Sequence, residues 1–159
     1  MKLRRRVRPA GDGGCHLNLP AGERALLRSL APDLRQVLDR SGDPDPVTER
    51  LFPAAYPEDD EREGEFRELV GGELESSLLQ ALEVLEATAD ADHLERDEAD
   101  AWLRALNQAR LVLGVRLAIS EDGAERPREA TDPRAGAFAT YDYLSLLQEE
   151  LLDALGPPR

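Results

Sequence analysis

Apolar residues recur at spacings of three and four along most of the chain, which is the pattern of amphipathic helices. This pattern predicts a helix over 20–40, a short helix followed by a long one over 46–88, a central helix over 96–119 and a C-terminal helix over 132–155. Pro32 lies inside the first of these, so we expect a kink or a break near Leu30. Gly71 and Gly72 weaken the middle of the long helix, either for a bend or for close approach of another helix.

The N-terminal 19 residues follow a two-residue alternation instead. Two short segments flank the glycine-rich sequence AGDGG, which predicts a small β-hairpin over 1–19. Strand geometry then puts alternate residues on opposite faces, with Arg4, Arg6 and Arg8 on one, read as a solvated face, and Leu3, Arg5 and Val7 on the other. Residues 121–131 are predicted to form a polar loop. The predicted fold class is mainly α, one domain over 1–159, built as a bundle of about four major helices with this hairpin.

The charge of the chain is acidic and unevenly distributed. Its net charge is −13 over 159 residues, although a basic arm opens the chain: Lys2, Arg4, Arg5, Arg6 and Arg8. An acidic body repels phosphates, so direct nucleic-acid binding is disfavoured and would depend on that arm alone. No apolar run reaches the length of a membrane span and no secretory h-region follows the basic start. We therefore expect a cytoplasmic protein without a membrane segment.

Catalytic and metal-binding motifs are absent from the sequence. Cys15 and His16 are adjacent in a predicted strand and point to opposite faces, which separates a thiol from its base. His16 and His93 lack a second ligand at helical spacing, and the acidic segment over 90–98 lacks the glycine of an EF-hand loop. We predict no enzyme, no metal and no cofactor. Cys15 is a candidate redox residue, because nearby arginines would lower its pKa.

The central helix carries a polar face among its most apolar residues. Asn107, Arg110 and Gly114 share that face, beside a stripe that begins with Trp102. In a structural interpretation, Arg110 pairs with Asp142 or another acid, Asn107 holds a loop and Gly114 admits the last helix. In a functional one, the face is a protein interface. The candidate interaction or structural residues are Trp102, Asn107, Arg110, Gly114, Arg116, Tyr141 and Asp142.

Three segments resemble an actinobacterial family, the domain of unknown function number two thousand and seventeen. They are LFPAAYPEDDEREGEFREL, DEADAWLRALNQARLVLGVRLAISED and DPRAGAFATYDYLSLLQEELLDAL, and the most specific parts are 106–117 and 141–148. The resemblance implies a small helical regulator, since a mycobacterial branch of the family regulates transcription under oxidative stress. Genes of this family commonly neighbour the gene of the ClpS protease adaptor, so the resemblance also implies a link to Clp-dependent proteolysis.

The same resemblance implies redox sensing through a cysteine pair and action with an alternative sigma factor. This chain departs from that pattern, because the positions four before and four after Cys15 are Gly11 and Leu19. Redox sensing here would need an intermolecular disulfide or a sulfenic acid. We predict a non-enzymatic regulatory protein that contacts a sigma factor or RNA polymerase. The alternatives are an accessory factor of Clp-dependent proteolysis and a helical domain for a small ligand; the sequence leaves a homodimer open.

Overall fold

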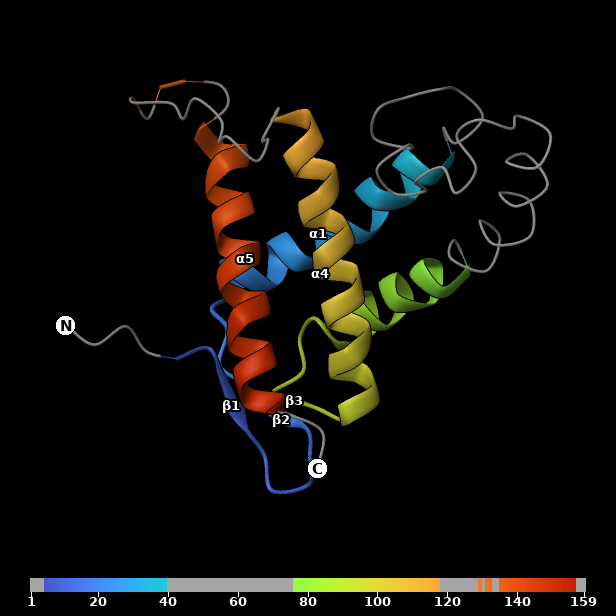
Figure 1. Ribbon diagram of the computed structural model, residues 1–159, viewed down its shortest axis with the longest axis vertical. Helices are drawn as coiled ribbons and strands as arrows, with labels where there is room; N and C mark the ends of the chain where they lie inside the picture. Colours follow the sequence, from blue (N-terminus) through green and yellow to red (C-terminus); the bar gives the residue numbers. More distant parts are fainter. Residues whose placement is uncertain (1–4, 40–75, 118–128, 130, 133–134, 157–159) are drawn as a thin grey trace, which may run out of the picture.

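The fold is mainly α with a small antiparallel sheet, as predicted (Figure 1). The computed structural model describes residues 5–39, 76–117, 129, 131–132 and 135–156. Along these residues the elements are β1 (Val7–Pro9), β2 (Cys15–Leu17), α1 (Ala21–Asp39), a helix over 76–88, β3 (His93–Leu94), α4 (Arg96–Arg116) and α5 (Ala135–Leu155). The predicted short helix after 46, the glycine pair at 71 and 72, and most of the predicted loop over 121–131 lie outside the described residues.

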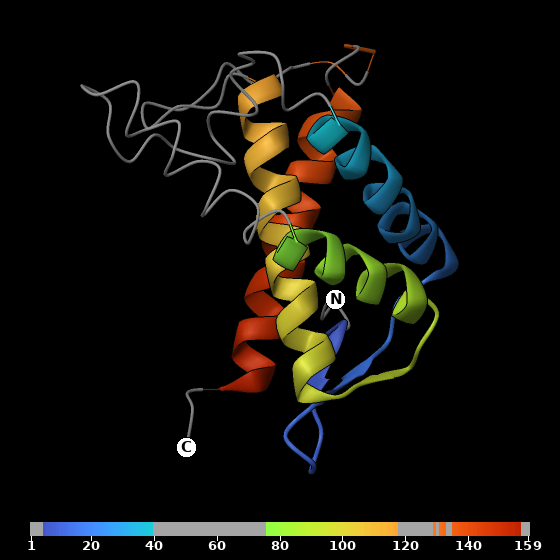
Figure 2. The same cartoon turned by 90° about the vertical axis from the view of Figure 1, so that its right-hand side faces the viewer.

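The four described helices form two pairs. Helices α4 and α5 lie side by side and antiparallel, whereas α1 and the helix over 76–88 cross beside them at a large angle (Figures 1 and 2). The small sheet lies at the end of the bundle where α4 begins and α5 ends (Figure 1). Within the described part of the chain, none of the helices has the length and apolar composition that crossing a membrane requires.

The three strands pair antiparallel in the order β1, β2, β3. The hairpin turn between β1 and β2 is the one predicted: Asp12 Oδ1 accepts the Gly14 N–H at 2.9 Å, and Gly13 has a φ of +91°. Gly14 must be a glycine, because a Cβ atom there would lie 2.1 Å from the Leu94 carbonyl oxygen. The strands are shorter than the predicted segments, and β3 was not predicted from the sequence. A two-residue strand leaves too little alternation to detect.

One apolar core joins the sheet to all four described helices. Its largest fully buried side chains are Trp102, Leu27, Leu82, Leu85, Leu94, Leu106, Leu144, Leu147, Leu151, Val7 and Cys15. Each helix contributes residues at spacings of three and four, and β1, β2 and β3 contribute one face. The N-terminal strands are therefore part of the fold, because Val7, Cys15 and Leu94 are fully buried.

We predicted a kink or a break near Leu30; the break is wrong, since α1 is a single helix with Pro32 inside it. Pro32 and Arg28, whose carbonyl loses its usual donor, are both exposed, so water can satisfy that carbonyl.

Helix α4 begins at Arg96, as predicted, and Glu98 accepts the Glu95 N–H at 2.8 Å in a capping interaction. Helix α5 begins at Ala135, later than the predicted 132.

Candidate functional site

Arg110, on the polar face of α4, contacts α5. Arg110 Nη1 donates to Gln148 Oε1 at 2.8 Å, and the guanidinium lies 5.4 Å from the centre of the Tyr141 ring. Among the described contacts, the partner of Arg110 is therefore an amide where an acid was expected. Arg110 Nε is buried without a hydrogen-bond partner there. This arrangement supports the structural interpretation of Arg110: it links the two central helices.

The other candidates on this face are in different environments. Trp102 is 0% exposed, and its Nε1 donates to Thr88 Oγ1 at 2.7 Å. A partner cannot reach it in this fold, so Trp102 serves the core. Asn107 is half-buried and Gly114 is buried, while the Arg116 side chain lies outside the described residues.

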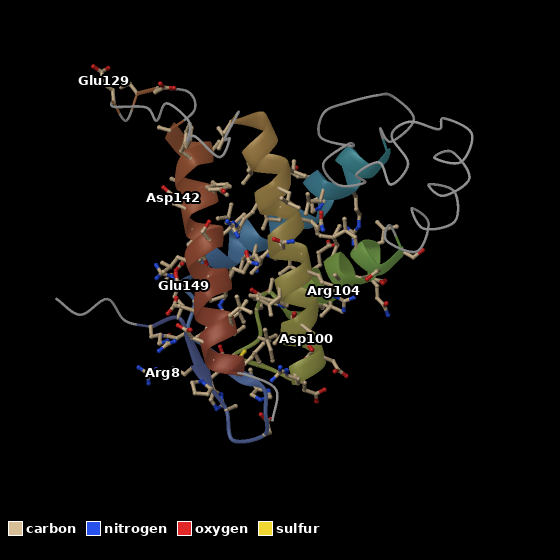
Figure 3. The ribbon with its side chains drawn as sticks, in the orientation of Figure 1. Arg8, Asp100, Arg104, Glu129, Asp142 and Glu149 are labelled. Carbon is tan, nitrogen blue, oxygen red and sulfur yellow. The ribbon has the colours of Figure 1, made fainter. Side chains whose placement is uncertain are left out.

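Two arginines of the basic arm are held against the helices. Arg5 contacts Asp153 at 3.2 Å, and the Arg6 guanidinium contacts Glu23 at 2.5 Å and lies 5.6 Å from the centre of the Tyr143 ring. The predicted solvated face of Arg4, Arg6 and Arg8 is wrong for Arg6, because β1 begins only at Val7 and the strand alternation does not extend back to it. Arg8 is exposed, as predicted (Figure 3). Lys2 and Arg4 lie outside the described residues.

Sequence reasoning missed a buried polar cluster around this arm. The Arg6 backbone N–H donates to Glu150 Oε1 at 3.0 Å across 144 positions in the sequence. Glu150 Oε2 and Tyr143 Oη are buried without hydrogen-bond partners among the described contacts. Burial, followed by the negative charge of Glu23, raises the pKa of Tyr143. No local sequence signal could reveal this cluster, because its members meet only when the arm docks on α1 and α5.

Cys15 is in the core instead of on a reactive surface. Its side chain is 0% exposed, and burial raises the pKa of its thiol to about 11, with the Asp12 charge acting in the same direction. The expectation that arginines lower this pKa is wrong. Arg6 and Arg5 are occupied by carboxylates on α1 and α5, and desolvation dominates at Cys15. A thiol in this state is a poor nucleophile.

Arg24 connects α1 to the turn before β3. Its guanidinium donates to three backbone carbonyls, those of Leu19, Ala89 and Ala91, at 3.0, 3.0 and 2.8 Å. It also contacts Asp92 at 3.1 Å. The side chain is 13% exposed. This set of bonds positions the segment that forms β3, and nothing in the sequence pattern indicated it.

Both histidines of the chain meet on the outer face of the sheet. His16 and His93 are opposite each other in the β2–β3 register, and their ring centres are 5.4 Å apart. His93 Nε2 lies 2.8 Å from Asp12 Oδ2. The hydrogen bond from the Gly14 N–H holds the pKa of Asp12 below its ordinary value, and His93 contributes in the same direction. The sequence analysis found no partner for either histidine, because it did not predict β3.

An exposed strip on α5 is one surface, within the described part of the chain, that a partner could reach. We call it the α5 ridge and define it as Asp142, Leu146, Glu149, Leu152 and Asp153. Leu146 is 41% and Leu152 is 55% exposed, so the strip presents two large apolar side chains to solvent. Asp142 and Glu149 extend outward from the same side of α5 (Figure 3). The ridge therefore combines apolar area with negative charge.

A groove between α1, α4 and α5 is a candidate site for a small ligand. Among the described residues it is lined by Leu30, Leu34, Val112, Thr140 and their neighbours, with a volume of about 190 Å³. Pockets for drug-sized ligands are typically about 300–1,000 Å³. Its small volume gives little support to a drug-sized ligand in this groove.

Comparison with known proteins gives a family and two informative relatives. A family model described as domain of unknown function (DUF2017) matches residues 4–155. Oxidative stress regulator AosR of Mycobacterium tuberculosis (strain H37Rv) is 32% identical over 125 residues, which covers 68% of this chain and 57% of the relative. The protein of the same name from Mycobacterium bovis gives the same values. The chain thus spans less than three fifths of the length of these relatives. No solved structure matches it.

Proposed function

Because the chain belongs to the domain of unknown function (DUF2017) family, we propose that it is a regulatory protein of the oxidative-stress response. The observation that carries this proposal is the 32% identity to proteins named oxidative stress regulator AosR. The proposed role is non-enzymatic and cytoplasmic: the chain acts by binding another protein. The proposed partner is a sigma factor or another part of RNA polymerase.

The α5 ridge is the proposed contact surface. Its exposed leucines supply apolar area, and its carboxylates favour a partner with a basic, partly apolar surface. Arg110 on α4 contacts Gln148 and Tyr141 on α5, so these residues support the helix that carries the ridge. The basic arm is not proposed to bind nucleic acid, because Arg5 and Arg6 are already paired with carboxylates.

The proposal does not require oxidation of Cys15. A buried thiol with a raised pKa reacts slowly with peroxide. We therefore expect partner binding by Cys15→Ser to match that of the unchanged chain. This distinguishes the present proposal from a cysteine-switch mechanism, in which the substitution would abolish the response.

Affinity capture from an extract of the native host, with and without peroxide, tests the proposal. Recovery of a sigma factor or polymerase subunit, reduced at least about tenfold by the double variant Leu146→Gln, Glu149→Arg, would support it. The matched control is Leu79→Gln, Glu83→Arg, because Leu79 is 38% exposed and both residues lie on the helix over 76–88. Equal loss in both variants contradicts the α5 ridge as the contact. Recovery of Clp components instead supports the proteolysis alternative, and self-association alone supports a homodimer.

A further inference from the structure

We propose that His16 and His93 form a two-imidazole site for a divalent transition-metal ion, with Asp12 as the positioning carboxylate of His93. The inference is independent of the proposed function, because it rests on the outer face of the sheet and not on the α5 ridge. Imidazole nitrogen is a preferred ligand of Zn²⁺, Ni²⁺ and Cu²⁺. The chain contains two histidines, and the fold brings them together.

The strand register explains why the two rings face the same way. Directly opposed residues of an antiparallel pair have their side chains on one face of the sheet, with Cβ atoms about 4.5–5.5 Å apart. His16 and His93 are such a pair, and the neighbouring pair, Cys15 and Leu94, points to the core. The histidines therefore share the solvent face, and the buried thiol is not a competing ligand.

The ring separation suits one shared ion. An imidazole nitrogen binds Zn²⁺ at about 2.0–2.1 Å, so two rings bound to one tetrahedral ion have their centres roughly 5 Å apart. The observed separation is 5.4 Å with a tilt of 58° between the ring planes. The observed separation of the ring centres is therefore close to that of two rings that share one ion.

Asp12 supplies a second observation that favours a metal. Ligating histidines typically donate their other ring N–H to a carboxylate, which fixes the tautomer and increases ligand basicity. Asp12 Oδ2 lies 2.8 Å from His93 Nε2, and Asp12 is itself fixed by the Gly14 N–H. A neutral His93 that donates from Nε2 keeps its lone pair on Nδ1, where an ion can bind.

The surroundings are open and negatively charged. The His93 side chain is 35% exposed and Asp12 is 56% exposed, so an ion can enter from solvent. Asp12, Glu95 and Asp97 line an adjoining hollow together with Arg96, which gives the region an excess of carboxylates. Among the described residues, no group of three or more His, Cys, Asp and Glu side chains is arranged to hold a metal. The site thus provides two protein ligands, and water completes the coordination.

Titration of the untagged full chain with Zn²⁺, followed by calorimetry and by NMR of the histidine ring protons, tests this inference. We expect one ion per chain and simultaneous shifts of both imidazoles. His16→Ala and His93→Ala should each weaken binding at least about tenfold, and Asp12→Asn by about tenfold.

Glu83→Gln is the matched control for Asp12→Asn, since Glu83 is an exposed carboxylate on the helix over 76–88. It should leave the affinity unchanged, and circular dichroism should show that every variant is folded. Absence of Zn²⁺ binding at millimolar concentration overturns the inference. Binding that stays within about twofold in both histidine variants overturns it as well, since the ion would then occupy another site. Neither result bears on partner capture by the α5 ridge.

Discussion

Cys15 should be nearly unreactive in the folded protein, although it is the only cysteine of the chain. The perturbation is addition of a thiol reagent such as dithionitrobenzoate at neutral pH. Two properties of the fold oppose the reaction: the side chain is 0% exposed, and burial raises its pKa to about 11. The reagent must reach the sulfur, and the sulfur must be a thiolate when it does.

The size of the effect follows from these two properties. At pH 7, a thiol with a pKa of about 11 has on the order of 100-fold less thiolate than a cysteine with an ordinary pKa of about 8.5. Burial adds a second factor, because labelling requires β2 and β3 to separate from the core, and such opening is rare in the stable part of a domain. We expect labelling at least about 1,000-fold slower than in denaturant.

Stopped-flow absorbance with and without about 6 M guanidinium measures both rates on the same sample. A matched comparison is an exposed cysteine introduced by Ser29→Cys in a Cys15→Ser background, because Ser29 is exposed on α1. That variant should react at a rate close to the denatured value. A native Cys15 rate within about tenfold of the exposed cysteine would refute the reasoning, and would restore a direct redox role for this thiol.

Three further predictions address the fold. The pKa values of Cys15 and Tyr143 are raised in the folded state. Each group therefore stabilises the folded state fully below its unfolded pKa, and this stabilisation is lost as the pH rises towards the folded pKa. Denaturant unfolding should show that Cys15 contributes a loss of about 3 kcal/mol between pH 8.5 and about 11, and this loss should be absent in Cys15→Ala. Gly14→Ala should cost at least about 2 kcal/mol in urea unfolding, because its Cβ would collide with a backbone carbonyl of β3, and an unchanged midpoint would contradict that contact. Arg24→Met should lower the free energy of unfolding by about 2–4 kcal/mol, because three backbone carbonyls lose their donor. Hydrogen exchange should show the loss of amide protection first in the turn over 89–92. A uniform loss of protection over the chain would argue against a local connection.

The periodic part of the fold could be predicted from the sequence. Spacings of three and four located α1, α4 and α5, because each helix buries one stripe and the stripe is written in consecutive turns. The AGDGG turn was equally readable, since Gly13 adopts a positive φ and Asp12 accepts the Gly14 N–H within the turn. No break occurs in α1, because the carbonyl that loses its donor at Pro32 belongs to the exposed Arg28 and can bond to water.

Most of the candidate site could not be predicted in this way. The burial of Cys15, the pairing of Arg6 with Glu23 and the approach of His16 to His93 all join segments that are distant in the sequence. A single sequence records which side chains alternate, whereas the environment of a thiol or an imidazole depends on which segments pack against it. The sequence therefore determined the helices, the turn and the acidic charge. Only the tertiary structure decided that the thiol is buried, that the arginines of the arm are paired and that two histidines share one face.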